Sequence, residues 1–434
     1  MNEISLGDRK AFSEAYDAHR AGDLERAKQL YEGLLARYPD LSPLLNAIGT
    51  VYLDCNRIDE AEKYFKKATL QAPPYIPALY NLARIKQIKA ETSHALALYE
   101  RITQLQPEFG PAWNNLALIL RGQGRMEQAC RAMEKAAGLM LDHAEVFNNL
   151  GVMLEAVGRL QEAETSFLKA IELHQDYFSA HFNLACLYHR LERFNDAERE
   201  LEWILARRPN DPGALFLLQS LGRLPSPRRA PTEYVSKTFD DCAVTFEEKL
   251  AKLEYKTPQM LFSKVRPYLG HDMTIMDLGC GTGLGAEFYR PFARSIHGMD
   301  CSERMLSIAE KKGIYHRLIR QDILSRWKTD KSYDLIYSSD CLVYFGDLRP
   351  VFSIVAQHLR PGGIFAFTVE GMEEQEESRG YVLRRSGRFA HSTHYVETCL
   401  RNKGFDLVVS SGCVLRKEAG KPVTGLLVVA RLVE

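Results

Sequence analysis

The chain has 434 residues, of which 46% are apolar, and its 56 Lys and Arg residues balance 56 Asp and Glu residues. This length exceeds one ordinary domain, and the apolar content is enough for packed cores. The zero formal charge provides no field that would draw the chain to nucleic acid, and no stretch approaches the roughly 18 apolar residues of a membrane span. Nine cysteines without a CxxC pair or a zinc-like Cys and His cluster predict reduced thiols and no metal site. An N-terminal sequence with neither a basic nor an apolar signal region predicts a cytoplasmic protein.

The first half of the sequence repeats every 34 residues. Small residues at this spacing let paired helices approach closely, and bulky residues fill the space between pairs. Three columns keep the period: Ala27, Ala61, Ala95, Ala129, Ala163 and Ala197; Ala15, Gly49, Ala83, Ala117, Gly151 and Ala185; Tyr31, Phe65, Tyr99, Met133, Phe167 and Leu201. The segment resembles a tetratricopeptide array, which implies an all-α superhelix of six repeats and a capping helix over residues 1–221.

A row of asparagines accompanies the repeats. Asn81, Asn115, Asn149 and Asn183 also lie 34 residues apart, one residue before a core leucine on each first helix. Amides combine donors with acceptors, so a row of them suits an extended peptide backbone of any sequence. The row resembles the asparagine ladder in the superhelix of protein O-linked N-acetylglucosamine transferase, which implies a peptide-binding inner face. The alternative is that asparagine is simply common in this column of tetratricopeptide repeats.

A proline-containing segment, residues 222–232, follows the repeats. Its sequence, GRLPSPRRAPT, has three prolines and no apolar periodicity, which predicts a semi-rigid connector to a second domain, residues 233–434. The next stretch carries Phe239, Phe246, Leu250 and Leu253 at helical spacing. It is expected to form an amphipathic helix that packs on the second domain.

A glycine-rich loop opens the second domain. The sequence IMDLGCGTG predicts a strand buried on both faces that ends near Asp277, and its glycines let the backbone turn sharply and approach a ligand. Asp300 closes the next strand, where its carboxylate can accept hydrogen bonds from ribose hydroxyls. These features predict a nucleotide-cofactor site. A nicotinamide cofactor stays open at this point, because the dinucleotide pattern is also satisfied by Gly281, Gly283 and Ala286.

Three further signals follow in order along the chain. LIRQDIL places Asp322 at the end of a short apolar run, where its carboxylate can accept the exocyclic amine of an adenine; YDLIYS predicts a fourth strand; and HLRPGGIFAFT predicts a helix end, a turn and a fifth strand. From about residue 234 onward the chain resembles class I methyltransferases that use S-adenosylmethionine. The resemblance implies an enzyme with an α/β Rossmann-like seven-stranded sheet whose last strand is antiparallel.

The resemblance also implies where the S-adenosylmethionine cofactor binds. The acid before the glycines helps place the methionine end, the second acid holds the ribose, and the third faces the adenine. Aromatic side chains of an N-terminal helical lid are expected near the methionine end, although helix packing on the sheet explains them equally well. The implied cofactor-binding residues are Asp277, Gly279, Cys280, Gly281, Gly283, Asp300, Cys301, Asp322, Ile323, Ser339, Phe239 and Tyr255, with Phe246 as a further lid aromatic.

The acceptor is expected beyond the ends of the fourth and fifth strands. There Asp340 can orient a nucleophile or accept its proton, unless it caps a helix, and Tyr344 can shape the pocket. For a hydroxyl or amine acceptor His391 is the predicted base, and for a carboxylate acceptor Arg384 or Arg388 can bind it bidentately. The alternative is an ordinary surface loop. The acidic residues Glu373, Glu374, Glu376 and Glu377 just upstream predict a solvated helix face.

The predicted function is methyl transfer to an acceptor that the repeat array recruits or shields, namely a peptide, a protein or a carrier-bound intermediate. Two alternatives differ in class. In the first, the chain is an interaction scaffold with a non-catalytic methyltransferase fold. In the second, it is a small-molecule methyltransferase whose repeats mediate homo-oligomerisation. The sequence does not name the acceptor atom.

Overall fold

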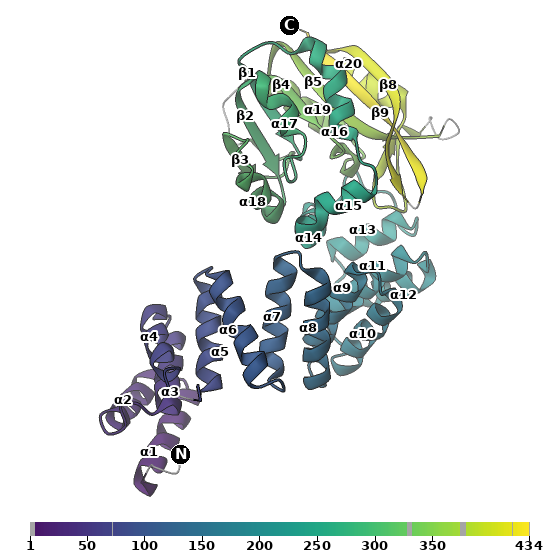
Figure 1. Cartoon of the computed structure of the whole chain (residues 1–434). Coiled ribbons are helices and arrows are strands. Elements are labelled where there is room, and N and C mark those ends of the chain that lie inside the picture. The colour runs from purple at the N-terminus through teal and green to yellow at the C-terminus, as the bar shows by residue number, and fades with distance from the viewer. Residues whose placement is uncertain (1–4, 72, 328–331, 374–378, 419, 434) are drawn as a thin grey trace. The chain divides into compact units, whose positions relative to one another are not determined.

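The computed structural model describes residues 5–71, 73–327, 332–373, 379–418 and 420–433 (Figure 1). Contacts divide the chain into two compact units, Met1–Leu187 and Tyr188–Glu434. Within the described ranges, no helix combines the length and the apolar character needed to cross a bilayer.

Helical hairpins with the 34-residue period build the first unit and continue into the second. Their helices are α1 (Leu6–Arg20), α2 (Leu24–Leu35), α3 (Ser42–Asp54), α4 (Ile58–Ala68), α5 (Ile76–Ile88), α6 (Thr92–Leu105), α7 (Gly110–Gly122), α8 (Met126–Leu139), α9 (Ala144–Ala156), α10 (Leu160–Leu173), α11 (Phe178–Arg190) and α12 (Phe194–Arg207), followed by α13 (Pro212–Ser220). All members of the predicted columns of small and bulky residues are buried. The predicted tetratricopeptide fold is therefore confirmed.

Two hairpins carry glycine in the small column because their bulky partner is phenylalanine. A Cβ added at Gly49 of α3 would lie 2.6 Å from the ring of Phe65 on α4. At Gly151 of α9 the corresponding distance to the ring of Phe167 on α10 is 2.5 Å. Real Cβ atoms do not approach this closely, so the contact between the two helices requires glycine at both positions.

A further column with the same period marks the turn inside each hairpin. The backbone φ is positive at Gly22, Asn56, Ala90, Gly124, Gly158 and Glu192. Glycine and asparagine adopt this left-handed conformation readily, whereas other residues adopt it at a cost of roughly 1–2 kcal/mol. Because Ala90 and Glu192 occupy two of the six turns, this column is difficult to recognise from the sequence alone.

A nine-stranded sheet forms in the described part of the second unit. Its strands are β1 (Met273–Leu278), β2 (Ala293–Asp300), β3 (Arg317–Arg320), β4 (Tyr333–Ser338), β5 (Leu359–Gly371), β6 (Tyr381–Leu383), β7 (Phe389–His391), β8 (Phe405–Glu418) and β9 (Lys421–Leu432). Strands β3, β2, β1, β4 and β5 are parallel in that order, β9 lies antiparallel to β5, and β8 lies antiparallel to β9. These seven strands confirm the predicted sheet with an antiparallel last strand.

The short hairpin β6–β7 adds the two strands that the sequence did not predict. Strand β7 continues the sheet by pairing parallel to the end of β5, where Glu370 aligns with Ala390. Strand β6 then pairs antiparallel to β7. With three residues each, these strands are too short to show a two-residue alternation of apolar side chains.

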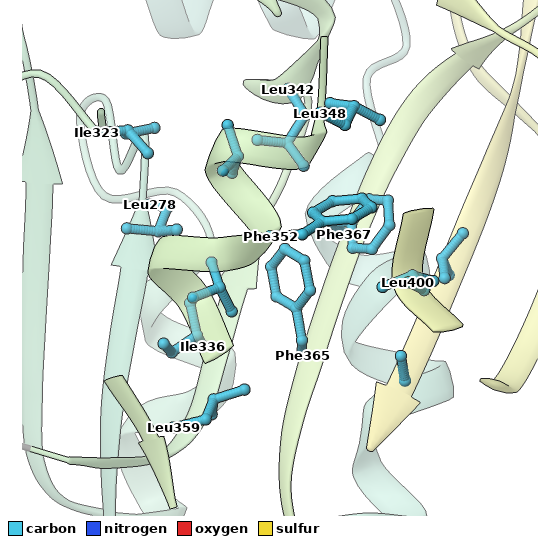
Figure 2. Close-up of a cluster of buried hydrophobic side chains, with 14 of the residues drawn as sticks. Leu278, Ile323, Ile336, Leu342, Leu348, Phe352, Leu359, Phe365, Phe367 and Leu400 are labelled. Carbon is cyan, nitrogen blue, oxygen red and sulfur yellow. The ribbon is translucent and has the colours of Figure 1, made fainter. Parts of the chain in front are cut away.

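Helices cover both faces of the sheet. The helices after the repeats are α14 (Thr232–Cys242), α15 (Phe246–Lys252), α16 (Thr257–Val265), α17 (Ala286–Tyr289), α18 (Glu303–Lys311), α19 (Arg349–His358) and α20 (Thr393–Arg401), of which α16, α17, α19 and α20 pack on the sheet. One core packs α16 and α17 against alternate residues of β1, β4 and β5, and the other packs α19 and α20 against the residues between them. Figure 2 shows Phe352 of α19 beside Phe365 and Phe367 of β5, with ring centroids 5.6 and 5.2 Å away. Burial on both faces explains why these strands read as continuous apolar runs.

An apolar cluster joins α13 to the β6–β7 hairpin inside the second unit. Phe216 of α13 and Phe389 of β7 are fully buried in it, together with Ala230, and Tyr344 packs against it. The ring of Phe216 lies 5.0 Å from that of Tyr234 on α14. The last helix of the repeat region therefore contributes to the core of the sheet-containing unit.

The segment before α14 pairs with the chain that follows β4. The N–H of Ala230 donates to the carbonyl of Tyr344 over 2.8 Å, and the N–H of Gly346 donates to the carbonyl of Arg228 over 2.8 Å. Arg229 and Phe345 form an antiparallel bridge between them. This part of the proline-containing segment is thus fixed by backbone hydrogen bonds.

Candidate active site

A cavity lies at the carboxyl ends of β1, β2 and β4, where the strand order reverses direction at β1. Ligands of open α/β sheets bind at such a switch point. The structure brings most of the predicted site residues together there. Those that line the cavity are Asp277, Gly279, Cys280, Gly281, Asp300, Cys301, Asp322, Ile323, Ser339, Phe239, Phe246, Tyr255, Asp340, Tyr344 and Arg388.

The loop after β1 approaches its neighbours too closely for any residue but glycine at its first position. Gly279 has a φ of +70°, and a Cβ there would lie 2.3 Å from Sγ of Cys341. Its N–H donates to the carbonyl of Met299 at 2.8 Å, which turns the loop toward β2. The backbone of this loop consequently lines the cavity without side-chain obstruction.

Gly283 has a different environment from the other two predicted glycines. Its φ is +84°, but a Cβ there would meet the ring of Tyr315 at 2.9 Å. Gly283 is not among the described residues that line the cavity. Its glycine therefore serves the packing of Tyr315 against the loop, and we do not retain Gly283 among the residues that contact a cofactor.

Asp277 is a buried carboxyl group held by two tyrosines. The hydroxyls of Tyr315 and Tyr337 donate to its Oδ2 at 2.7 and 2.6 Å, and only 3% of the residue is exposed. Burial raises the pKa of Asp277 to about 7, against the opposing effect of the two hydrogen bonds. Near neutral pH the group therefore exchanges a proton.

The raised pKa of Asp277 predicts a pH dependence of folding stability. The folded state holds a proton that the unfolded state releases near pH 4, so stability is full at acid pH and falls as the pH rises to about 7, by at most about 1.4 kcal/mol per unit. Asp277→Asn should remove this slope. Urea denaturation between pH 4 and pH 8 measures it. The exposed Asp406→Asn should keep the wild-type slope, and an unchanged slope in Asp277→Asn would contradict the assignment.

Asp300 connects the end of β2 to the glycine loop. Its Oδ2 accepts the N–H of Gly281 at 2.9 Å, and its Oδ1 accepts the N–H of Ser302 at 2.8 Å. Burial raises the pKa of Asp300, although these N–H groups oppose the rise. A carboxylate has about four acceptor sites, so this group retains capacity for a hydroxyl donor in the cavity.

Asp322 is held by residues that precede the sheet. Its Oδ2 accepts the guanidinium of Arg229 at 2.8 Å and also the hydroxyl of Thr232, and its Oδ1 accepts the N–H of Leu324 at 2.8 Å. Burial acts to raise the pKa of Asp322, but the donors from Thr232, Leu324 and Arg229 outweigh it, so the pKa is lowered. Asp322 is therefore an ionised carboxylate with a fixed orientation.

Aromatic side chains from the segment before the sheet cover part of the cavity. Phe239 on α14 makes edge contacts with Phe246 of α15 and with Tyr344, at centroid distances of 5.9 and 5.7 Å. Asp240 anchors α14, because its Oδ1 accepts the hydroxyl of Ser302 at 2.5 Å and the N–H of Arg304 at 3.0 Å. These aromatics have the location expected of a lid.

A buried network of charges borders the cavity beyond β4. Nη1 of Arg416 lies 2.9 Å from both carboxylate oxygens of Asp340, while its Nη2 donates to Glu370 and its Nε to Glu418 at 2.7 Å. Arg388 pairs with Glu418 and lies 3.8 Å from Glu370. The carboxylate of Asp340 therefore faces Arg416 and does not cap a helix. Burial raises the pKa of Asp340, opposed by the charges of Arg416 and Arg388.

The predicted base His391 does not line the cavity. Its side chain is fully buried on β7, with Nε2 2.8 Å from the carbonyl of Phe345 and with Nδ1 lacking a hydrogen-bond partner among the described residues. Burial lowers the pKa of His391 to about 4, so the ring is neutral at physiological pH. Since it does not line the cavity, we do not retain His391 as a base.

Arg384 also lies outside the residues that line the cavity. Its N–H donates to the carbonyl of Arg388 at 2.8 Å and closes the turn between β6 and β7. Of the two arginines predicted to hold an acceptor, the structure thus directs Arg388 alone to the cavity. Most of the predicted acidic helix face, residues 374–378, falls outside the described residues.

The asparagine row of the first unit forms rungs between successive repeats. Nδ2 of Asn81 donates to Oδ1 of Asn46 at 3.0 Å, and Nδ2 of Asn183 donates to Oδ1 of Asn148 at 2.9 Å. Asn115 donates instead to the hydroxyls of Tyr80 and Tyr99, at 3.1 Å each. All four predicted residues, Asn149 included, are half-buried. Part of their hydrogen-bonding capacity therefore holds the repeats together.

Three residues of the site escaped the sequence analysis. Arg416 is buried on a strand, and its partners lie up to 76 residues away along the chain. Arg229 and Thr232 lie in the segment that its prolines marked as a connector. A charged residue directly after the apolar Val414 and Leu415 near the end of β8 was the only signal for Arg416. We find no group of His, Cys, Asp or Glu arranged to hold a metal ion in the ranges that the structure describes.

Comparisons with known proteins agree with both halves of the fold. Residues 275–363 match the family described as a methyltransferase domain, and residues 18–85, 109–176 and 142–210 match tetratricopeptide repeat families. The methyltransferase match removes the nicotinamide alternative. Phosphoethanolamine N-methyltransferase 2 of Caenorhabditis elegans is 32% identical over 122 residues, which cover 26% of this chain and 28% of that protein.

Two further similarities concern the same region. The malonyl-[acyl-carrier protein] O-methyltransferase of Bacillus cereus is 28% identical over 33% of this chain and 55% of that protein. An S-adenosylmethionine-dependent methyltransferase structure from Clostridium acetobutylicum is 22% identical with a TM-score of 0.36, covering 44% of this chain and 100% of that one. The chain spans only 28% to 55% of the length of the two curated relatives. The chain therefore contains tetratricopeptide repeats and a methyltransferase domain, whose strand order is that predicted for a class I fold.

Proposed function

We propose that the chain is an S-adenosylmethionine-dependent methyltransferase whose repeat array recruits or shields the methyl acceptor. The observation that carries this proposal is that the glycine loop, Asp300 and Asp322 line one cavity at the carboxyl ends of the strands. These three elements come from the ends of three successive strands.

The residues around the cavity fit the cofactor. Asp300 has acceptor capacity for the ribose, Asp322 for the adenine, and Phe239 and Tyr255 line the same cavity as Asp277, beside which the methionine end would lie. When bound, the cofactor supplies an electrophilic methyl group on a sulfonium. The chain contributes alignment of the two reactants and exclusion of water by the aromatic lid, which can provide most of the acceleration of such a displacement.

The acceptor is proposed to bind between Asp340, Tyr344 and Arg388, all of which line the cavity. A carboxylate with a raised pKa is a stronger base, so Asp340 can take the proton of a hydroxyl or amine acceptor. Arg388 is suited to hold an anionic group of the acceptor. The two curated relatives are named for phosphoethanolamine and for a malonyl carrier protein, and both of these acceptors carry anionic groups.

Calorimetry with S-adenosylhomocysteine tests the proposal. The full chain should bind it with a dissociation constant on the order of micromolar, equivalent to about 8 kcal/mol. Asp300→Ala, which removes the ribose acceptor, should bind it at least about tenfold more weakly. A wild-type chain that shows no binding heat would favour the non-catalytic scaffold.

Labelled methyl transfer into a lysate of the source cell then addresses the acceptor, with mass spectrometry of the labelled products and the Asp300→Ala chain as the blank. Label in a protein, a peptide or a carrier-bound product supports recruitment by the repeats. Label in free small molecules alone favours the alternative in which the repeats mediate oligomerisation.

A further inference from the structure

The segment that leads into α14 reaches the cofactor side of the cavity. We name residues 228–232 the strap. Backbone hydrogen bonds of 2.8 Å fix it to the chain after β4 at both Arg228 and Ala230. Arg229 and Thr232 line the cavity together with Asp322. The strap is therefore part of the wall of the cavity, and its position is set independently of any ligand.

The strap fills both acceptor sites of one carboxylate oxygen of Asp322. Each carboxylate oxygen has two acceptor sites. Both sites of Oδ2 are filled, one by the guanidinium of Arg229 and one by the hydroxyl of Thr232. Oδ1 accepts the N–H of Leu324 at 2.8 Å. Among the described hydrogen bonds, this leaves one acceptor site on the carboxylate, and it is on Oδ1.

A carboxylate at the end of a two-bond side chain can rotate, and rotation would exchange its two oxygens. The paired donors from Arg229 and Thr232 oppose this rotation, because turning the group would break both bonds. The guanidinium also keeps the carboxylate ionised, and an ionised carboxylate is purely an acceptor. The remaining site on Oδ1 is thus held ready for a donor from the cavity.

We infer that Arg229 and Thr232 are positioning residues for the cofactor, which orient Asp322 so that its remaining acceptor site receives the exocyclic amine of the adenine. This inference rests on the proposed function, because it requires an adenosyl ligand in the cavity. It extends the cofactor site beyond the glycine loop and the strand ends, to a segment that precedes the sheet. The consequence is selectivity for a 6-amino purine over a 6-oxo purine.

The experiment compares two ligands by calorimetry on the full chain. They are S-adenosylhomocysteine and S-inosylhomocysteine, in which oxygen replaces the 6-amino group and presents an acceptor to the carboxylate. The wild-type chain should prefer the adenosyl ligand by at least about tenfold, as expected for a hydrogen bond to a charged group. In Arg229→Ala and in Thr232→Val this preference should fall to about threefold or less.

Two matched variants complete the comparison. Thr232→Ser keeps a hydroxyl and should keep the preference. Arg223→Ala removes another half-exposed arginine, which pairs with Glu198 at 2.9 Å at a distance from the site, and should leave both affinities unchanged. A ratio of affinities is insensitive to a uniform loss of folded protein, so it reports positioning and not stability.

The outcomes separate the inference from the function on which it rests. If the wild-type chain binds neither ligand, the proposed function fails. If the wild-type chain prefers the adenosyl ligand and both variants keep that preference, the positioning role is overturned. Loss of both ligands to the same extent in Arg229→Ala and Thr232→Val would also overturn it, because the strap would then only enclose the cavity.

Discussion

Gly279→Ala should eliminate most of the affinity of the chain for S-adenosylhomocysteine and lower its free energy of unfolding by about 2–5 kcal/mol. Two effects add. A φ of +70° costs alanine roughly 1–2 kcal/mol, and the new Cβ would overlap Sγ of Cys341, which lies 2.3 Å from its ideal position. The loop must shift to relieve this contact, and a shift breaks the hydrogen bond from the Gly279 N–H to Met299.

A second glycine isolates the steric part of this effect. Gly313 has a similar φ of +65°, but no atom lies within 4 Å of the Cβ that alanine would add there. Gly313→Ala should therefore show only the conformational cost of about 1–2 kcal/mol and normal ligand affinity. Urea denaturation and calorimetry measure both quantities in both variants. Equal effects of the two substitutions would show that contact with Cys341 is unimportant.

Arg416→Ala should destabilise the chain by about 3–5 kcal/mol, the cost of leaving buried charges without their partner. Arg416 is only 3% exposed and contacts three carboxylates, those of Asp340, Glu370 and Glu418. After its removal, Arg388 is the one described cation that still pairs with any of these three carboxylates, namely those of Glu370 and Glu418. Urea denaturation at pH 7 measures the loss, and Arg416→Lys should be intermediate because an ammonium cannot form the same planar set of bonds.

The loss should depend on pH. Burial raises the pKa values of Asp340 and Glu370 above their unfolded values, and the charge of Arg416 opposes the rise. Without the arginine these pKa values rise further. A carboxyl group with a raised folded-state pKa stabilises at acid pH and loses that contribution as the pH rises through the folded value. The deficit of Arg416→Ala should consequently shrink as the pH falls through the raised folded-state pKa values of these two carboxyls.

A surface ion pair provides the control for Arg416. Arg401 pairs with Glu397 at 3.1 Å, and the two side chains are 62% and 24% exposed. Water already solvates such a pair, so Arg401→Ala should cost less than about 1 kcal/mol. If both substitutions cost the same, the buried network does not contribute to stability as proposed.

The sequence predicted what depends on local repetition and on strand ends. The 34-residue period is visible in the sequence because every hairpin buries a small and a bulky residue at the same positions, as Ala61 and Phe65 show. Asp277, Asp300 and Asp322 were predictable because a residue at or just past the carboxyl end of a parallel strand reaches the ligand edge of the sheet. These signals need no knowledge of distant contacts.

The rest of the fold and of the site depends on contacts between residues far apart in the sequence, which no local pattern indicates. His391 was predicted as a base because imidazole exchanges protons near neutral pH, yet the pairing of β7 with β5 buries it completely. Arg416 met its partners only when the antiparallel β8 brought it beside Asp340 and Glu370. The prolines near Arg229 predicted a connector, but composition is silent about the backbone pairing with residues 344–347 that fixes this segment.

The burial of Phe216 among residues of the β6–β7 hairpin limits how the two kinds of structure can be recombined. A transplanted methyltransferase domain that starts after the prolines would leave an unfilled hollow beside Phe389 and Tyr234. Gene fusions that exchange the helical array for one of another length would thus have to retain α13. The natural module for engineering or for evolutionary shuffling begins upstream of this helix, within the repeats themselves.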